Sequence, residues 1–450
     1  MLPGAVAAAT VTASVMLAVC PAATAIAAPA PVQLESPTES PAPTPLAIPD
    51  DPSDPVRARE YWLDGANIRD AWHTTRGEGV TIAVLDTGVG DAAGAFDDVV
   101  VRGTDVSGAG ASDGRTPVGV IGRDHGTLVA SMAAAPGKTD GTGMIGVAPR
   151  AKVLSVSLGF PGSSATVPFT EQVAEGMKWA VDHGADIINL SFTTNTLDWD
   201  ESWDDAFLYA YEHDVVVVVA AGNRGSGTSI VGAPATIPGV LTVGGVDQTG
   251  VASVGASTQG ITIGVSAPSE ALIGLTADGK LSQWDGTSGA APIVAGAAAL
   301  VRAAHPDLDA ANVINRIIKT AVPVPEMKKP HDALYGYGLL DANAAVSASV
   351  PLVTENPMGD LTEWIRLHRR ADSPDEPDPV PTSTPVAVPP LPPAEPPTEP
   401  GSPLLPTAES LRYGTLPLLA VTVPGILVAL GVTAAARRIR TERGRRAPTP

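Results

Sequence analysis

Four apolar runs rich in β-branched residues constrain the fold of this chain more than any other feature. The runs are residues 80–85, 152–158, 186–192 and 215–221. Continuous apolar runs of this length are typical of parallel strands that are buried on both faces. Segments with helical patterns lie between and after them, at residues 125–135, 169–182, 203–212, 288–304 and 309–321. We therefore predict an α/β fold with a doubly wound, mostly parallel sheet, in which shorter strands and glycine turns follow residue 240.

The N-terminal segment has the composition of a signal peptide rather than of a folded domain. Residues 1–28 contain no charged side chain, residues 5–19 are apolar, and small residues stand at 25 and 27 in Ala25-Ile26-Ala27, as a signal peptidase requires. Cys20 follows Leu17-Ala18-Val19, which resembles a lipoprotein box, so lipidation of Cys20 stays open as a second interpretation. The sequence has no other cysteine, which excludes a disulfide scaffold and a zinc site built from cysteines.

The C-terminal part has the composition of a stalk and a membrane anchor. Residues 371–410 contain 14 prolines, seven carboxylates and no Lys or Arg, which favours an extended, partly polyproline II segment. Residues 413–436 are uncharged and mostly apolar, and about 20 such residues cross the ~30 Å core of a bilayer as a helix. The residues that follow carry six arginines and one glutamate, so the positive-inside rule places them in the cytoplasm. A buried helix of a soluble domain is the alternative for 413–436.

These compositions predict six segments in different environments. They are a signal peptide at 1–28, a Pro-rich N-terminal extension at 29–57, a folded domain at 58–353, a Pro-rich acidic linker or stalk at 354–412, a single transmembrane helix at 413–436 and a basic cytoplasmic tail at 437–450. The folded domain is then expected outside the cytoplasm, attached to the cell membrane. The formal net charge of −20 argues against a nucleic-acid partner, which would need a basic face.

A carboxylate stands at the expected end of the first strand. In Leu85-Asp86-Thr87-Gly88 the aspartate follows the apolar run, and the glycine permits a sharp turn after it. Ligands of open parallel sheets bind at the carboxyl ends of the strands, although a turn-forming or capping role would also place an aspartate here. The DTG sequence also occurs in aspartic peptidases, but those need two such carboxylates, and the chain contains no second DTG or DSG.

A histidine and a serine stand at the starts of two predicted helices. His125 lies in the small-residue block DHGTLVA (124–130), and Ser288 lies in GTSGAAP (286–292), which opens an alanine-rich helix. A serine hydroxyl becomes a nucleophile when a histidine accepts its proton and a buried carboxylate fixes the tautomer of that histidine. Asp86, His125 and Ser288 provide these three groups in the order Asp, His, Ser. A helix-capping role is the alternative for Ser288, and we interpret the other histidines as structural or exposed.

The three motifs resemble those of the subtilisin-like serine peptidases, the subtilases, in order and approximate spacing over residues 61–350. The resemblance implies a parallel α/β fold, serine endopeptidase activity on polypeptides and a catalytic triad of Asp86, His125 and Ser288. It also implies that Asn223, in Ala220-Ala221-Gly222-Asn223, donates its amide to the oxyanion. The residues implied in substrate binding form two strand edges and one pocket wall: Ser157, Leu158 and Gly159; Ser191, Phe192 and Thr193; Ala233 and Pro234.

Two residues depart from the subtilase pattern. Gly289 stands where subtilases often carry Met or another larger residue. We expect it to weaken the helix start by about 1 kcal/mol relative to Ala and to remove packing behind Ser288. Thr193 replaces an expected glycine, and its branched side chain is expected to narrow the substrate groove. Neither departure removes a catalytic atom.

Within the subtilases, the chain is most similar to the mycosins, which are membrane-anchored enzymes associated with type VII secretion. The similarity rests on the lead-in at 62–72, the HGTLVA block, the ending at 335–341, the Pro-rich stalk and the basic-tailed anchor. It implies the type VII secretion machinery as a partner and requires no cofactor. Subtilases often bind structural calcium, which the acidic chain is compatible with, but the sequence has no EF-hand-type ligand loop and we assign no metal ligand. Two alternatives stay open: a catalytically silent scaffold of a membrane secretion complex, and a general secreted-type protease.

Overall fold

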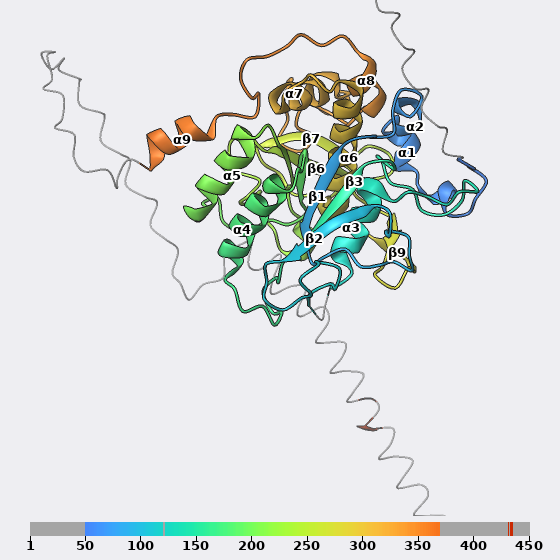
Figure 1. The fold of residues 1–450 in the computed structure, drawn as a ribbon. Helices are drawn as coiled ribbons and strands as arrows, with labels where there is room; N and C mark the ends of the chain where they lie inside the picture. Colours follow the sequence, from blue (N-terminus) through green and yellow to red (C-terminus); the bar gives the residue numbers. More distant parts are fainter. Residues whose placement is uncertain (1–49, 120–121, 370–430, 432, 435–450) are drawn as a thin grey trace, which may run out of the picture. The chain divides into compact units, whose positions relative to one another are not determined.

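A seven-stranded parallel sheet forms the centre of the folded domain (Figure 1). The computed structural model of the chain describes residues 50–119, 122–369, 431 and 433–434. The strand order is β2-β3-β1-β4-β5-β6-β7, and every neighbouring pair is parallel. The strands are β1 (Thr81–Asp86), β2 (Val100–Asp105), β3 (Lys152–Ser157), β4 (Ile187–Leu190), β5 (Val216–Ala220), β6 (Leu241–Val246) and β7 (Ile263–Pro268), followed by an antiparallel hairpin of β8 (Leu272–Leu275) and β9 (Leu281–Trp284). The prediction of a doubly wound parallel sheet is confirmed.

Helices cover both faces of the sheet. They are α1 (Trp62–Gly65), α2 (Ile68–Ala71), α3 (His125–Ala134), α4 (Phe169–Asp182), α5 (Ser202–Glu212), α6 (Thr287–Ala304), α7 (Ala310–Thr320), α8 (Ala342–Ser347) and α9 (Leu361–His368). Alternate residues of β1 face opposite sides, as the two-residue period of a strand requires. Ile82 and Val84 join the core that contains α3 and α6, whereas Ala83 and Leu85 join the core under α4 and α5. Both faces of the central strand are therefore buried, which explains why its sequence is continuously apolar.

Helix α6 is the central helix of one of these cores. It contacts strands β4 to β7. Among the described residues it is the helix long and apolar enough to cross a membrane, but 83% of its 18-residue window is buried inside the domain. Its hydropathy therefore reflects its place in the core. The predicted signal peptide at 1–28, most of the predicted transmembrane helix at 413–436 and the tail at 437–450 lie outside the described residues.

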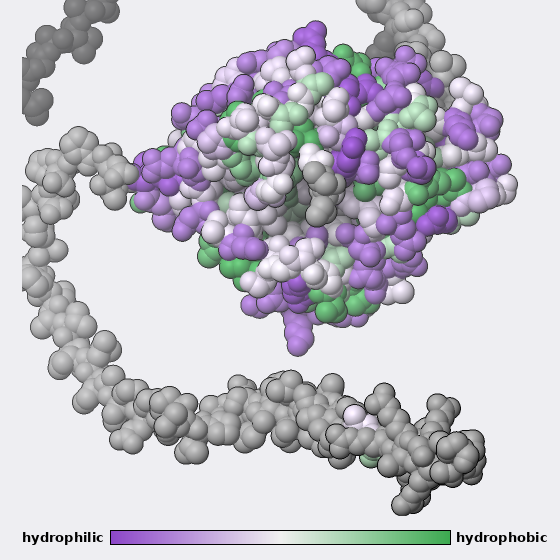
Figure 2. All heavy atoms as spheres, turned by 90° about the horizontal axis from the view of Figure 1, so that it is seen from below, coloured by the Kyte–Doolittle hydropathy of each residue, from purple (hydrophilic) through white to green (hydrophobic). Residues whose placement is uncertain are grey.

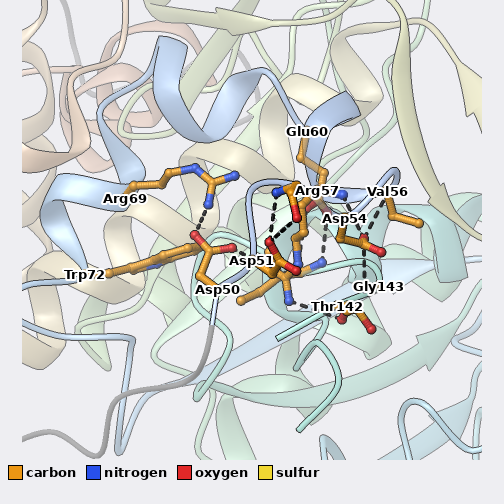
Figure 3. A network of polar contacts seen from close by, with 12 residues as sticks. Asp50, Asp51, Asp54, Val56, Arg57, Glu60, Arg69, Trp72, Thr142 and Gly143 are labelled. Carbon is orange, nitrogen blue, oxygen red and sulfur yellow. Dashed lines mark hydrogen bonds and ion pairs between the residues drawn. The ribbon is translucent and has the colours of Figure 1, made fainter. Parts of the chain in front are cut away.

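The folded domain includes Asp50, which precedes the predicted boundary at residue 58. The side chain of Arg57 is fully buried and lies 3.6 Å from the Asp50 carboxylate and 3.9 Å from that of Glu60 (Figure 3). Glu60 in turn accepts a hydrogen bond from the backbone N–H of Ile145 at 2.8 Å. The predicted start was wrong because these polar side chains contact one another and the loop before β3, instead of facing water as part of a linker.

The domain also extends beyond residue 353, where the sequence predicted a linker. Helix α9 packs against α5, and the ring of Trp364 lies 4.3 Å from that of Trp199, centroid to centroid. Arg369 follows α9, donates to Asp204 at 2.7 Å, and places its guanidinium over both tryptophan rings. The part of the chain that packs on the domain therefore reaches Arg369. The residues from 370 to 412 lie outside the described part of the chain.

The strand order places the end of β1 at the reversal point of the sheet. The chain runs from β1 to β2 and β3 on one side and then to β4, β5, β6 and β7 on the other. Ligands of doubly wound sheets bind at this point, outside the carboxyl ends of the strands. The loops that follow β2 and β3 lie at the lower end of the domain in Figure 1. Figure 2 shows the domain from below, where hydrophilic groups lie among residues of intermediate hydropathy and several hydrophobic patches.

Candidate active site

A cavity of about 470 Å³ opens at the carboxyl ends of the parallel strands. Three of the predicted catalytic and oxyanion-binding residues line it: His125 from the start of α3, Ser288 from the first turn of α6, and Asn223 from the loop after β5. Asp86 lies behind His125, fully buried at the end of β1. The structure therefore brings together four side chains that are far apart in the sequence.

The Asp86 carboxylate binds the imidazole of His125. Nδ1 of His125 lies 2.9 Å from both carboxylate oxygens, and the backbone N–H of Thr87 donates to Oδ1 at 2.7 Å. An ionised carboxylate at this distance requires the proton on Nδ1, which leaves Nε2 of the neutral ring as the acceptor. Burial acts to lower the pKa of His125, but the charge and the hydrogen bond of Asp86 outweigh it and raise that pKa above its ordinary value.

Two small features let α3 approach the end of β1 closely enough for this contact. Thr87 Oγ1 accepts from the backbone N–H of Gly126 at 2.9 Å and donates to the carbonyl of Arg123 at the same distance. A Cβ on Gly126 would lie 2.6 Å from the carbonyl oxygen of Gly88 and 3.1 Å from Cβ of Asp86. The glycine of the HG motif is therefore required by close approach, and Thr87 is a site residue that the sequence analysis did not single out.

Ser288 is held by a reciprocal pair of hydrogen bonds with Ser191. Ser288 Oγ donates to the carbonyl of Ser191 at 3.0 Å, and Ser191 Oγ donates to the carbonyl of Ser288 at 2.9 Å. The second bond is available because Pro292 lacks the N–H that would otherwise bind the Ser288 carbonyl within the helix. Pro292 thus leaves the Ser288 carbonyl without a partner inside α6. The hydrogen bond from Ser191 to this carbonyl holds the first turn of the helix, which carries Ser288, in place.

The amide of Asn223 is oriented by the residue before Ser288. Thr287 donates to Asn223 Oδ1 with both its backbone N–H (2.8 Å) and its hydroxyl (3.0 Å). Because Oδ1 is occupied in this way, the NH₂ group is left for the cavity. Gly286 has a φ of +142°, and a Cβ there would lie 2.8 Å from Asn223 Nδ2. Glycine at this position therefore keeps the amide in place.

The predicted packing defect at Gly289 is absent. A Cβ on Gly289 would lie 2.3 Å from Cδ1 of Leu272 and 3.3 Å from the ring of Trp284. The space behind Ser288 is thus filled by the β8–β9 hairpin, and the expectation of lost packing was wrong. Trp284 also lies edge-on to His125, with 5.7 Å between ring centroids, so one side chain packs against both helix starts.

The first predicted substrate edge, residues 157–159, lies just before the residues that line the cavity in the structure. Ser157 and Leu158 are fully buried, and the backbone N–H of Gly159 donates to Gln172 Oε1 at 2.7 Å. These three residues do not line the cavity. They lie at the end of β3 and in the turn after it, where they are enclosed by the domain. The next four residues, 160–163, line the cavity instead.

The second predicted edge lines the cavity, whereas the predicted pocket wall does not. Ser191, Phe192 and Thr193 are all lining residues. Ala233 and Pro234 lie one layer further back: Ala233 is fully buried, and its carbonyl accepts from Thr193 Oγ1 at 3.4 Å. Thr193 therefore separates this segment from the cavity.

The described residues contain no group of three or more His, Cys, Asp or Glu side chains that could hold a metal ion. Structural calcium stays a prediction from the resemblance, because Ca²⁺ also binds backbone and amide oxygens.

Comparison with known proteins agrees with this geometry. A profile described as the Subtilase family matches residues 77–338, more than half of the chain. Subtilisin DY of Bacillus licheniformis is 32% identical over 307 residues, which cover 67% of this chain and 98% of that protein. Mycosin-4 of Mycobacterium tuberculosis is 33% identical over 329 residues, which cover 64% of this chain and 69% of that protein. Fervidolysin of Fervidobacterium pennivorans is 33% identical over 334 residues, and the match spans 65% of this chain but 44% of fervidolysin.

Solved structures give the same result. The crystal structure of MycP1 from the ESX-1 type VII secretion system is similar with a TM-score of 0.56 and 27% sequence identity, over 69% of this chain and 92% of that one. Together with the sheet, the buried aspartate behind a histidine and the serine at a helix start, these matches show that the chain belongs to the subtilase family of serine endopeptidases.

Proposed function

We propose that Asp86, His125 and Ser288 are the catalytic triad of this endopeptidase and that Asn223 binds the oxyanion. The observation that carries the proposal is the 2.9 Å contact between Asp86 and His125 beside a cavity that both His125 and Ser288 line. A buried carboxylate that fixes a histidine next to a partly exposed serine is the arrangement that acyl transfer requires.

The proposed reaction begins with a rotation of the Ser288 side chain. In the free enzyme its hydroxyl donates to the carbonyl of Ser191, and catalytic hydrogen bonds are often formed only when substrate binds. Rotation about Cα–Cβ turns the hydroxyl toward Nε2 of His125, which accepts the proton as Oγ attacks the peptide carbonyl. Asp86 stabilises the resulting imidazolium.

The carbonyl oxygen becomes negatively charged during this attack. Asn223 offers its NH₂ group to that oxygen, because Thr287 already occupies Oδ1. The backbone N–H of Ser288, in the first turn of α6, has no acceptor within the helix and supplies a second donor. His125 then protonates the departing amine, and a water molecule, activated by the same imidazole, hydrolyses the acyl-enzyme.

Labelling with a fluorophosphonate probe tests the triad. These probes react with activated serine nucleophiles, so the wild-type protein should be labelled and Ser288→Ala should not. Ser163→Ala is the matched control for a serine that lines the same cavity but does not contact Ser288, and it should remain labelled. Equal absence of label in wild type and Ser288→Ala would instead support the scaffold alternative.

We also propose that the enzyme is a mycosin-like, membrane-anchored peptidase that acts on polypeptides outside the cytoplasm and serves type VII secretion. Similarity to Mycosin-4 and to MycP1 from a type VII secretion system supports this role. The uncharged residues 413–436 and the arginines after them support a single anchor with a cytoplasmic C-terminus. The match over 98% of subtilisin DY favours the alternative of a general protease.

Two measurements separate these proposals. A reporter that works only in the cytoplasm, fused after Pro450, should be active, and silence there would overturn the proposed orientation. Genes for secretion-channel components next to this gene would favour the type VII role, whereas their absence would favour a general protease. Neither result depends on the triad.

A further inference from the structure

The proposed catalytic roles place the substrate residue before the cut beside two neighbouring strand ends. Ser288 donates to the carbonyl of Ser191 at the end of β4, and Asn223 follows β5, which pairs with β4 in parallel. A substrate carbonyl held between Ser288 and Asn223 therefore lies next to both strand ends. Thr193 follows β4 and Gly222 follows β5, and both line the cavity. The size of the space between them therefore limits the substrate.

Two threonine methyl groups occupy that space. A Cβ built on Gly222 would lie 2.7 Å from Cγ2 of Thr193 and 2.5 Å from Cγ2 of Thr228. Carbon atoms in ordinary contact lie about 3.5–4.0 Å apart, so the face of Gly222 has no room for even one more carbon. The two methyls come from different loops and meet over the same glycine.

Neither threonine is free to move away. Thr193 Oγ1 donates to the carbonyl of Gly232 at 2.8 Å, which fixes the rotamer of its methyl. Thr228 is 9% exposed, and its backbone N–H donates to the carbonyl of Asn223 at 3.0 Å. Further back, a Cβ on Gly232 would lie 2.0 Å from the carbonyl oxygen of Thr194. The segment around Gly232, whose carbonyl holds Thr193, is therefore itself tightly packed against the backbone.

We propose that Thr193 and Thr228 determine specificity and restrict the substrate residue before the cut to a small side chain such as Ala, Ser or Gly. The proposal rests on the catalytic assignment of Ser288 and Asn223, because these residues fix where the substrate carbonyl lies. A longer or aromatic side chain would overlap both methyls. A mismatch of one methylene in such a pocket changes kcat/KM by about 10–200-fold.

Peptides that differ only in the residue before the cut test the proposal. The series carries Ala, Leu or Phe at that position, and fluorophosphonate labelling gives the concentration of active enzyme. Thr193→Ser, Thr228→Ser and the double variant remove only the methyl groups, and Thr193→Ser keeps the hydroxyl that binds Gly232. Thr362→Ala, which removes an exposed threonine of α9 outside the cavity, is the matched control.

We expect the wild-type enzyme to prefer Ala over Leu by at least about tenfold in kcat/KM, and the double variant to reduce that preference by about tenfold or more. Thr362→Ala should leave the preference unchanged. A wild-type preference for Leu or Phe overturns the proposal, as does an unchanged Leu-to-Ala ratio in a fully labelled double variant. Failure of the wild type to react with the probe is a different result, because it contradicts the catalytic assignment itself.

Discussion

Replacing Gly289 by alanine tests how the start of α6 is packed behind Ser288. The added Cβ would lie 2.3 Å from Cδ1 of Leu272, more than ~1 Å closer than an ordinary carbon contact. Leu272 is fully buried, so it has no space into which it can turn. Overpacking of this kind costs about 1–3 kcal/mol, whereas alanine gains about 1 kcal/mol in helix propensity. We expect Gly289→Ala to lower the free energy of unfolding by up to ~2 kcal/mol.

Leu272→Ala supplies the internal control, because it removes the methyl that the new Cβ would meet. That variant alone should lose about 2–5 kcal/mol. In its background, Gly289→Ala should become stabilising by about 1 kcal/mol, which gives a coupling energy of about 1–3 kcal/mol between the two sites. The assay is urea unfolding followed by tryptophan fluorescence, with every protein carrying Ser288→Ala to prevent self-digestion. Additivity of the two changes to within about 0.5 kcal/mol would refute this reasoning.

Three further changes test other parts of the site and the fold. Asn223→Ala should lower kcat by about 10²–10³-fold, the magnitude known for the corresponding change in subtilisin, with little change in KM; steady-state kinetics that show a loss of only a few fold would contradict the oxyanion role. Asp86→Asn should move the acidic limb of the kcat/KM profile to lower pH, because Asp86 outweighs burial and raises the pKa of His125; a limb at the same pH in both proteins would argue against their coupling. Burial raises the pKa of Glu60 from 4.5 to about 8, so the stability that its protonated form contributes is fully present below about pH 4.5 and is lost as the pH rises through about 8. Glu60→Gln should therefore gain stability relative to wild type between those pH values in denaturant titrations, and parallel pH profiles would show that Glu60 is not the group responsible.

The sheet and the contact between Asp86 and His125 were predictable because their signals are local. The apolar runs predicted β1, β3, β4 and β5 to within two residues at each end. Asp86 and His125 each stand at the boundary of an element, so fixing the elements also fixed where these side chains lie. Parallel strands bring their carboxyl ends to one edge of the sheet, and the sequence therefore contained enough information to bring the two residues together.

The parts that sequence analysis missed depend on contacts between distant segments. Gly289 was expected to leave a packing defect, but Leu272 and Trp284 fill that space from a hairpin whose position is set by the tertiary fold. A charged residue such as Arg57 predicts a solvated linker when the sequence is considered alone. Its burial becomes understandable only in the structure, where Asp50 and Glu60 lie beside it.

The substrate edge was misplaced for a related reason. Whether Gly159 or the residue after it faces the cavity depends on where β3 turns away from the sheet. The hydrogen bond from Gly159 to Gln172 on α4 fixes that turn, and no periodicity in the sequence records it. Residues 160–163 line the cavity as a result.

The most direct test of the central claim is whether Ser288 and His125 act as one catalytic unit. The measurement is kcat on a single peptide substrate for Ser288→Ala, His125→Ala and the double variant. If His125 acts only by accepting the proton of Ser288, each single change should abolish the same pathway, and the double variant should be no slower than either one, as in subtilisin. Losses that multiply in the double variant would show that the two side chains act independently and would contradict the proposed triad.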